Sequence, residues 1–584
     1  MSDAEMTQGE AEMTPADAAA TCCATFVDTW IRLGVTHACI APGSRSTPMA
    51  LALAARSELS LSIHHDERSA AFAALGVGLA SGQPAIVLTT SGTAAVHLHA
   101  AVVEADLARV PLLALTADRP PELQGVGAPQ TIDQRELYGR AVRAYIDAGV
   151  PEATSRDEWR STAARAFGSC LVPAPGPVQL NLPFREPLLG NVRALPPVGG
   201  ELHGRAVDAT DLPIAPDTVD QLVRLVSGRR GVVVAGYGID DPVAVHRLAA
   251  VLGWPVLADA RSGARLEGSP AIAHADALLR VDEWAATHQP EVVVRVGDPW
   301  ASKVVTQWLA ATPELVIVDR HAVWIEPDRR PTLRMHTTAT MLAATMAPLV
   351  SPVGEQWLQS WIRAEEMAEQ AVSAALGGDA PLSEPLIASI VAQHSLDYSA
   401  VVAASSMPVR DIEWYGGRRD RITHYANRGA NGIDGVVSTA IGVALTGRRV
   451  IALVGDIAFL HDSSAMIALA RRQIDLTIVV IDNDGGGIFS FLAQADALDR
   501  ERFELLFGTP HGTDIAAVAR AHRIDAVDVD TAEEFSVAFM KATDASGVHV
   551  VVARTDRDEN VAVHRRIHDT VARAVATQHD LGAE

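Results

Sequence analysis

One stretch of the chain, residues 455–489, carries a carboxylate and an amide at positions that a parallel sheet would bring together. Its sequence is GDIAFLHDSSAMIALARRQIDLTIVVIDNDGGGIF, with Asp456 near one end and Asn483 near the other. Each follows a strongly apolar run, VIALVGD or LTIVVIDN, of the kind that forms a buried strand. In an open parallel sheet, ligands bind outside the carboxyl ends of the strands. We therefore expect Asp456 and Asn483 to face one ligand site.

The residue types at this site suit a divalent cation beside a diphosphate. A carboxylate, an amide oxygen and the carbonyl of Gly485 are ligands that Mg²⁺ accepts, and Mg²⁺ fills its remaining positions with phosphate oxygens and water. The glycine run 485–487 lets a ligand approach the backbone closely. We expect a helix to begin near His461 and to point its positive N-terminal end at the diphosphate. Either end of the stretch alone would be an ordinary turn, whereas the two together favour the site.

Apolar strand-like runs alternate with alanine-rich helical stretches along almost the whole chain. Continuous apolar strands between helices are typical of parallel sheets covered on both faces, so we predict an α/β fold of three doubly wound domains. Breaks rich in Pro and Gly at 185–218 and near 345–355 indicate linkers. Residues 1–18 are expected to form a frayed tail. These breaks give the predicted domain ranges, which are 15–195, 210–350 and 365–575.

The composition excludes several classes of function. The chain has 584 residues and a net charge of −23, whereas nucleic acids and membrane surfaces bind basic faces, so we expect neither as a partner. No run approaches the length of a membrane span, and the acidic N-terminal segment has no apolar signal region, so we predict a cytoplasmic protein. The four cysteines show no C-x-x-C spacing, which predicts inert thiols.

The two ends of the opening stretch resemble the diphosphate-binding motif of thiamine diphosphate enzymes. The family pattern is usually GDG at the start and NN at the end, and this chain has GDI at 455–457 and DN at 482–483. The resemblance implies that Asp456 and Asn483 bind Mg²⁺, or Mn²⁺ in its place, through their side chains, and Gly485 through its carbonyl. It places two further residues beside the cofactor, namely Gly455 and Ile457.

These enzymes also need a glutamate that contacts N1′ of the cofactor's aminopyrimidine. In LSIHHDERSAAFAALG, Glu67 lies between a strand-like and a helical segment, where the family's glutamate falls. Asp66 is the obvious competitor, and an acidic residue at a helix start is often only a cap. The resemblance implies that Glu67 is the catalytic residue, because its contact favours the imino tautomer that takes the C2 proton of the thiazolium.

Four stretches together resemble the 2-succinyl-5-enolpyruvyl-6-hydroxy-3-cyclohexene-1-carboxylate synthase family of menaquinone biosynthesis. They are IAPGSRSTPMALAL (40–53), TADRPPELQGVGAPQTIDQ (116–134), NRGANGIDG (427–435) and DGGGIFSFL (484–492). The resemblance covers nearly the whole chain and is weakest in the middle. It implies a transferase that decarboxylates 2-oxoglutarate on thiamine diphosphate and adds the resulting succinyl carbanion equivalent to isochorismate.

The two substrates bring four carboxylates, so their site needs fixed cations, and the planar fork of arginine binds carboxylates best. Lys303 aligns with a Lys-Arg pair of the family, but Val304 occupies the second position here. The resemblance implies eight substrate-binding residues, which are Ser44, Arg45, Arg119, Gln130, Lys303, Ser406, Arg410 and Arg428. Three apolar residues fall where the family packs cofactor or substrate, namely Ile433, Ile488 and Phe489.

The resemblance also implies a homodimer, or a dimer of dimers, in which two subunits share each site. Two alternatives stay open. One is another thiamine diphosphate-dependent 2-oxo acid decarboxylase or carboligase, such as acetohydroxyacid synthase, whose substrates need fewer cations. The other is a non-catalytic nucleotide-binding protein, suggested by VVVAGYGIDD at 232–241, although this run lacks the full G-x-G-x-x-G pattern.

Overall fold

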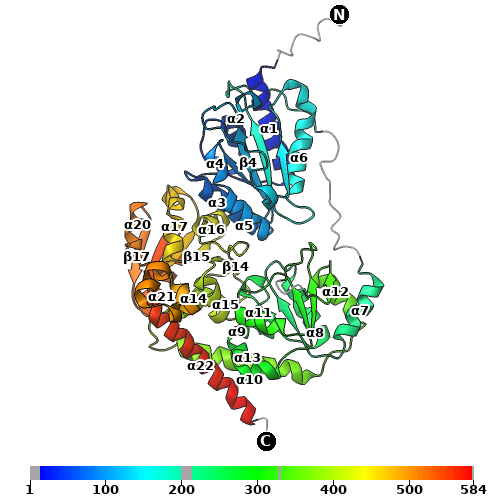
Figure 1. Ribbon diagram of the computed structural model, residues 1–584, viewed down its shortest axis with the longest axis vertical. Helices are drawn as coiled ribbons and strands as arrows, with labels where there is room; N and C mark the ends of the chain where they lie inside the picture. Colours follow the sequence, from blue (N-terminus) through cyan, green and yellow to red (C-terminus); the bar gives the residue numbers. More distant parts are fainter. Residues whose placement is uncertain (1–12, 199–212, 327–329, 582–584) are drawn as a thin grey trace, which may run out of the picture. The chain divides into compact units, whose positions relative to one another are not determined.

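The structure is a computed structural model that describes residues 13–198, 213–326 and 330–581 (Figure 1). These residues form three six-stranded sheets in which every pair of neighbouring strands is parallel. The predicted α/β class with three parallel-sheet domains is therefore confirmed. Within the described residues, no helix combines the length and the apolar character needed to cross a membrane.

The first sheet has the strand order β2-β1-β3-β4-β6-β5. Its central strand β4 is buried at every residue, as expected of a parallel strand covered on both faces. The strands are β1 (His37–Ile40), β2 (Ser60–Ile63), β3 (Ala85–Thr89), β4 (Leu112–Asp118), β5 (Ala144–Asp147) and β6 (Pro177–Pro183). The helices around it are α1 (Pro15–Leu33), α2 (Thr47–Ala54), α3 (Glu67–Ser81), α4 (Thr93–Val96), α5 (His99–Leu107) and α6 (Trp159–Ser169).

The second sheet has the order β12-β11-β10-β7-β8-β9, in which all strands are parallel and the order of addition reverses between β7 and β10. This is the strand order of the dinucleotide-binding fold. The strands are β7 (Gly231–Ala235), β8 (Val256–Ala258), β9 (Ala271–Ile272), β10 (Val292–Val296), β11 (Glu314–Val318) and β12 (Leu333–Met335). The helices are α7 (Pro216–Val226), α8 (Pro242–Leu252), α9 (Ala275–Leu279), α10 (Asp282–Thr287), α11 (Lys303–Ala310), α12 (Ala339–Met346) and α13 (Glu355–Leu376).

The third sheet has the order β14-β13-β15-β16-β18-β17, which repeats the topology of the first. The strands are β13 (Ala400–Ala403), β14 (Thr423–Tyr425), β15 (Val450–Gly455), β16 (Leu476–Asp482), β17 (Asp525–Val529) and β18 (Val548–Arg554). The helices are α14 (Glu384–His394), α15 (Met407–Tyr415), α16 (Val436–Leu445), α17 (Asp456–His461), α18 (Ala493–Ala497), α19 (Arg500–Phe503), α20 (Ile515–Ala521), α21 (Ala532–Asp544) and α22 (Arg557–Leu581).

The chain divides into two compact units. Unit 1 consists of Met1–Ala206, Asn427–Gly447 and His461–Leu469. Unit 2 consists of Val207–Ala426, Arg448–Leu460 and Ala470–Glu584. The loop before α16 and α16 itself thus belong with the first sheet, although the chain returns afterwards to the third. The domain boundaries expected from the sequence stay a prediction.

Helices α3 and α16 pack at close range within unit 1, and glycines make this possible. A Cβ on Gly76 would overlap the carbonyl of Thr439, and a Cβ on Gly442 would overlap the carbonyl of Ala73. Only glycine allows two helix backbones to approach so closely. The contact fixes α16, and with it the end of the preceding loop 427–435, against the helix that begins at Glu67.

Two segments expected to be irregular are partly ordered. Helix α1 begins at Pro15, with the Thr14 hydroxyl accepting a hydrogen bond from the Asp17 amide at 3.1 Å, so the predicted tail is wrong for residues 15–18. Residues 1–12 of that tail and 199–212 of the first linker lie outside the described residues. Residues 185–198 of this linker contain no helix or strand, as predicted. Helix α7, however, begins at Pro216, inside the predicted linker.

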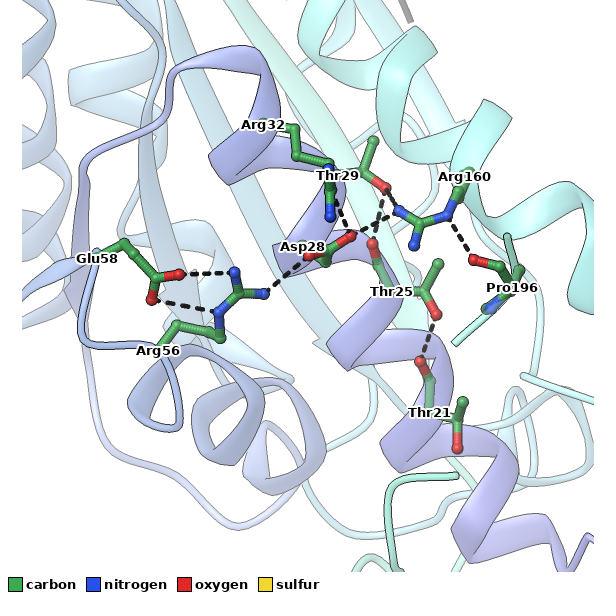
Figure 2. Close-up of polar contacts among 9 residues, drawn as sticks. All are labelled: Thr21, Thr25, Asp28, Thr29, Arg32, Arg56, Glu58, Arg160 and Pro196. Carbon is green, nitrogen blue, oxygen red and sulfur yellow. Dashed lines mark hydrogen bonds and ion pairs between the residues drawn. The ribbon is translucent and has the colours of Figure 1, made fainter. Parts of the chain in front are cut away.

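A single carboxylate, that of Asp28 on α1, joins three arginines from different parts of unit 1 (Figure 2). Asp28 Oδ2 accepts hydrogen bonds from Arg32 Nε and Arg160 Nη1, both at 2.9 Å, and Oδ1 accepts from Arg56 Nη1 at 3.1 Å. Arg160 Nε also donates to the Pro196 carbonyl at 2.9 Å, which ties the segment after β6 to the same cluster. Burial by itself would raise the pKa of Asp28, but the three arginines hold that pKa below its usual value.

We expect Asp28→Asn to lower the free energy of unfolding by about 3 kcal/mol at pH 7, because Arg160 would then be buried without a counter-charge. This difference in unfolding free energy is fully present above pH 3.8, the ordinary pKa of Asp. It declines as the pH falls through the lower pKa that Asp28 has in the folded protein. Urea unfolding at a series of pH values measures it. Glu58→Gln, which removes an exposed partner of Arg56, is the control and should change stability little. A loss that is equal at all pH values would contradict this account.

Candidate active site

The structure brings the two ends of the 455–489 stretch together at the carboxyl edge of the third sheet. Strands β15 and β16 are neighbours, with Gly455 opposite Ile481. Asp456 is the first residue after β15, and Asn483 is the first residue after β16. The Asp456 side chain is only 2% exposed. Its Oδ2 accepts hydrogen bonds from the backbone amides of Asn483 at 3.2 Å and Gly485 at 2.9 Å. One carboxylate therefore fixes the turn that carries the other two predicted ligands.

The side chain of Asn483 is oriented by a buried glutamate that sequence reasoning missed. Asn483 Nδ2 donates to Glu384 Oε1 at 2.8 Å, and Asn483 Oδ1 is buried without a hydrogen-bond partner among the described residues. A buried oxygen without a donor is costly unless something else binds it, and a cation would do so. Burial, followed by the charge of Asp411, raises the pKa of Glu384 to about 8. The only signal in the sequence was a helix start at SEPL.

His511 is a second neighbour of the site that the sequence did not indicate. Its Nε2 lies 3.3 Å from Asp456 Oδ2, and its Nδ1 accepts a hydrogen bond from the Thr513 amide at 2.9 Å. In the neutral ring the proton is therefore on Nε2, which faces the Asp456 carboxylate. Ligand atoms of Asp456, Asp482 and His511 also lie within 4.8 Å of one another. With the proton on Nε2 and Nδ1 accepting a hydrogen bond, however, His511 is a neighbour of Asp456 and not itself a metal ligand.

The glycine turn is shaped for close backbone approach, as expected from its sequence. Gly485 has φ +141°, and a Cβ there would overlap the carbonyl of Gly508. The Gly486 amide donates to that same carbonyl at 2.8 Å. By contrast, a Cβ on Gly455 would meet no protein atom within 4 Å, so the space beside Gly455 is open.

The prediction that a helix begins near His461 is wrong. Helix α17 begins at Asp456 and His461 is its last residue. The physical reason lies in Asp456, whose Oδ1 accepts a hydrogen bond from the Ile457 amide at 2.6 Å and so satisfies a donor of the first turn. The prediction of a positive helix end aimed at a diphosphate from His461 therefore fails.

In unit 1 the structure separates the roles of the two acids at the start of α3. Asp66 is the N-cap, and its Oδ1 accepts hydrogen bonds from the amides of Arg68 at 2.8 Å and Ser69 at 3.4 Å. Its Oδ2 accepts from the hydroxyl of Ser464 at 2.7 Å. Glu67 is the first residue of the helix and is half-buried. The capping role considered for the acidic pair thus falls to Asp66.

Two predicted substrate-binding residues meet at Ser91, which follows β3. Arg119 Nη1 donates to the Ser91 hydroxyl, and Gln130 Nε2 donates to the Ser91 carbonyl at 3.0 Å. Gln130 has φ +54°, a left-handed conformation that is rare outside glycine. Sequence reasoning missed Ser91, although its place between a strand and Gly92 in TTSGT was an available signal.

The same region concentrates positive charge. Arg45 is 6% exposed and donates to the Phe184 carbonyl and to Glu186 Oε1, both at 3.0 Å. Burial and the nearby charge of Arg45 both lower the pKa of Arg119. The two arginines bring two positive charges together in a chain of net charge −23, with Glu186 and Asp118 as their acidic neighbours. Ser44 directly precedes Arg45 in the loop before α2.

The remaining predicted residues are distributed over both units. Arg410 on α15 donates to the carbonyls of Ser405 at 3.1 Å and Ser406 at 2.6 Å, and burial lowers its pKa. Lys303 is exposed at the first residue of α11.

Four other predicted residues lie in glycine-bearing segments. Arg428 and Ile433 are in the loop before α16, and Ile488 and Phe489 follow the turn of the third sheet. Ile433 is 40% exposed, whereas Ile488 packs against the core and Phe489 against Phe507.

We expect Gly485→Ala to lower the free energy of unfolding by about 1–3 kcal/mol, because both the positive φ and the Gly508 carbonyl oppose a Cβ. Chemical unfolding measures the change. Gly455→Ala is the matched control at the same sheet edge, where a Cβ has open space, and it should leave stability within about 0.5 kcal/mol of wild type. Equal losses in the two variants would contradict this description of the turn.

Comparisons with known proteins agree with this arrangement. Three family models match: the N-terminal TPP binding domain of thiamine pyrophosphate enzymes over residues 21–137, the middle domain over 213–397, and the C-terminal TPP binding domain over 415–553. Proteins named 2-succinyl-5-enolpyruvyl-6-hydroxy-3-cyclohexene-1-carboxylate synthase are similar over nearly their whole length. That of Thermobifida fusca is 41% identical over 94% of this chain and 98% of its own. Those of Chloroflexus aurantiacus and Myxococcus xanthus are each 39% identical over 93% of this chain, and over 94% and 95% of their own. The chain therefore belongs to the 2-succinyl-5-enolpyruvyl-6-hydroxy-3-cyclohexene-1-carboxylate synthase family of thiamine pyrophosphate enzymes.

Proposed function

We propose that this protein joins 2-oxoglutarate to isochorismate with loss of CO₂, giving 2-succinyl-5-enolpyruvyl-6-hydroxy-3-cyclohexene-1-carboxylate, a step of menaquinone biosynthesis. The observation that carries the proposal is the match to synthases of that name over more than nine-tenths of the chain. Thiamine diphosphate, the same molecule as thiamine pyrophosphate, supplies the electron sink for decarboxylation and carbon–carbon bond formation. The protein's residues bind and orient the cofactor and the substrates, and they exchange protons with them.

Asp456, Asn483 and Gly485 would hold Mg²⁺, or Mn²⁺ in its place, beside the diphosphate of the cofactor. The unpartnered Asn483 Oδ1 and the buried Asp456 carboxylate support this role, because hard oxygen ligands at one sheet edge are what Mg²⁺ requires. His511 supports Asp456 from the side, with its ring proton facing the carboxylate. The open space beside Gly455 leaves room for the cofactor.

Glu67 holds a proton at N1′ of the aminopyrimidine. Its partner Asp66 is fully used by the α3 cap and by Ser464, which leaves Glu67 as the acid of the pair that can serve the cofactor. This role would require a hydrogen bond between Glu67 and the bound cofactor, with about 2.6–3.2 Å between heavy atoms.

The arginines bind the substrate carboxylates. Arg45 and Arg119 lie in one positive region with Ser44 and Gln130, and this region supports binding of a dianion such as 2-oxoglutarate or isochorismate. We assign Arg410, Arg428, Lys303 and Ser406 to the same task. A charge-assisted hydrogen bond of this kind contributes about 1.5–3 kcal/mol.

The alternatives are less well supported. Another thiamine diphosphate carboligase would need fewer cations than this chain places in its motif loops. A nucleotide-binding function would use the glycines after β7 in the second sheet, which has the appropriate strand order. There, however, a Cβ on Gly236 would overlap the carbonyl of Asp298, so this glycine serves a contact between two protein segments.

The activity is tested by incubating the protein with isochorismate, 2-oxoglutarate, thiamine diphosphate and Mg²⁺ and analysing the product by mass. We expect the succinyl adduct and CO₂.

Asp456→Ala should abolish Mg²⁺-dependent cofactor binding, measured by calorimetry, because it removes the carboxylate that holds both the metal and the turn. Asp475→Ala, a carboxylate before the amino end of β16, is the control and should bind cofactor normally. Normal cofactor affinity in folded Asp456→Ala would refute the metal assignment.

We further propose a homodimer or dimer of dimers in which Glu67 of one chain and Asp456 of another serve the same cofactor. The two residues belong to different compact units, which motivates the idea. Glu67→Gln and Asp456→Ala homodimers should both be nearly inactive. In a mixed dimer one site carries both lesions and the other carries neither, so subunit exchange should restore part of the activity. If mass analysis verifies exchange and no activity returns, both residues act within one chain.

A further inference from the structure

A buried acid in unit 1, Glu104, holds the loop that precedes α16. Glu104 lies on α5, is 2% exposed, and belongs to a helix face whose apolar residues Ala101 and Val102 are part of the core. Its Oε1 accepts a hydrogen bond from the Gly429 amide at 2.7 Å, and its Oε2 accepts from the Ala430 amide at 2.6 Å. Both oxygens of one carboxylate are thus used on two successive backbone amides.

The contact is close on the backbone side as well. A Cβ on Gly429 would lie 2.7 Å from the Glu104 carbonyl oxygen and 2.9 Å from the Ala108 amide nitrogen, so the loop rests directly on the end of α5. Asn431, two residues further on, has φ +64°, a left-handed conformation that costs energy outside glycine. Asparagine adopts this conformation more readily than most residues, and the two short hydrogen bonds to Glu104 fix the backbone immediately before it.

The residue between the fixed points is Arg428. On its N-terminal side, Asn427 is 2% exposed and its Nδ2 donates to the Thr439 hydroxyl on α16 at 3.1 Å. On its C-terminal side, the Gly429 and Ala430 amides are held by Glu104. The backbone of Arg428 is therefore fixed from both sides, and the origin of its side chain is fixed with it.

We propose that Glu104 is a positioning residue that sets the place of Arg428, and through it the binding of a substrate carboxylate. The inference deepens the proposed function and rests on it for the role of Arg428. A bidentate arginine–carboxylate contact depends on orientation, and a displacement of about 1 Å in a binding group can lower activity by about 100-fold. A carboxylate on two amides is the device that prevents such a displacement.

The first measurement is amide hydrogen exchange of the segment 427–435 in Glu104→Gln. Glutamine has one acceptor oxygen and an NH₂ group, so it can accept from only one of the two amides. We expect faster exchange in this segment. Asp17→Asn is the matched control, because Asp17 is also buried and accepts from a loop amide, that of Asn191 at 2.7 Å. It should speed exchange around residue 191 and leave 427–435 unchanged. Unchanged exchange of 427–435 in Glu104→Gln would overturn the proposal.

The second measurement is steady-state kinetics in a double-mutant cycle with Arg428→Ala. We expect Glu104→Gln to raise the KM of the substrate that Arg428 binds by about 10- to 100-fold, with a smaller change in kcat and unchanged cofactor affinity. If Glu104 acts through Arg428, then Glu104→Gln added to Arg428→Ala should cost little more. Fully additive losses would overturn the route through Arg428.

A second variant guards against poor folding of Glu104→Gln. Gly429→Ala leaves the carboxylate intact and displaces the loop from the other side, so it should reproduce both the faster exchange and the raised KM. Absence of both effects in folded Gly429→Ala would count against the proposal. A wild-type protein without synthase activity would refute the proposed function and, with it, the role given to Arg428, whereas hydrogen exchange would still decide whether Glu104 holds the loop.

Discussion

The carboxylate of Asp456 is the interaction on which the third-sheet site depends. It is almost fully buried, so its oxygens must find donors inside the protein, and they find them in the amides of Ile457, Asn483 and Gly485. These bonds start helix α17 and fold the turn after β16 back toward β15. The same carboxylate is the one proposed to bind the cation, so under that proposal the group that shapes the turn is also a metal ligand.

Buried carboxylates that accept backbone amides recur at several loops and at one helix start among the described residues. Glu104 holds the loop before α16, Asp462 accepts the Ser438 amide at 2.7 Å within α16, and Glu365 accepts two amides after β9. Loops and the first turns of helices carry amide donors without backbone partners, and an acid can satisfy two of them from one side chain. The acidic composition of the chain therefore includes residues with an internal, structural task.

Unlike the buried carboxylates, two arginines of unit 1 lie near the carboxyl ends of strands, where a ligand could bind. Arg45 is buried and Arg119 is half-buried, and burial together with the nearby charge of Arg45 lowers the pKa of Arg119, although the chain as a whole is strongly acidic. Like charges at close range are unfavourable in the free protein, and an anionic ligand relieves that cost. The arrangement suits a family whose substrates carry several carboxylates.

The sequence by itself determined the α/β class, the three parallel sheets and the meeting of Asp456 with Asn483. Apolar runs of strand length encode buried parallel strands, and parallel strands place their carboxyl ends on one edge. Only the tertiary structure decided that α17 begins at Asp456 and that Glu384 orients Asn483. It likewise decided that Glu104 holds Gly429 across 325 positions of the chain. Such contacts depend on how whole helices pack, and no local pattern in the sequence specifies which buried acid will face which loop.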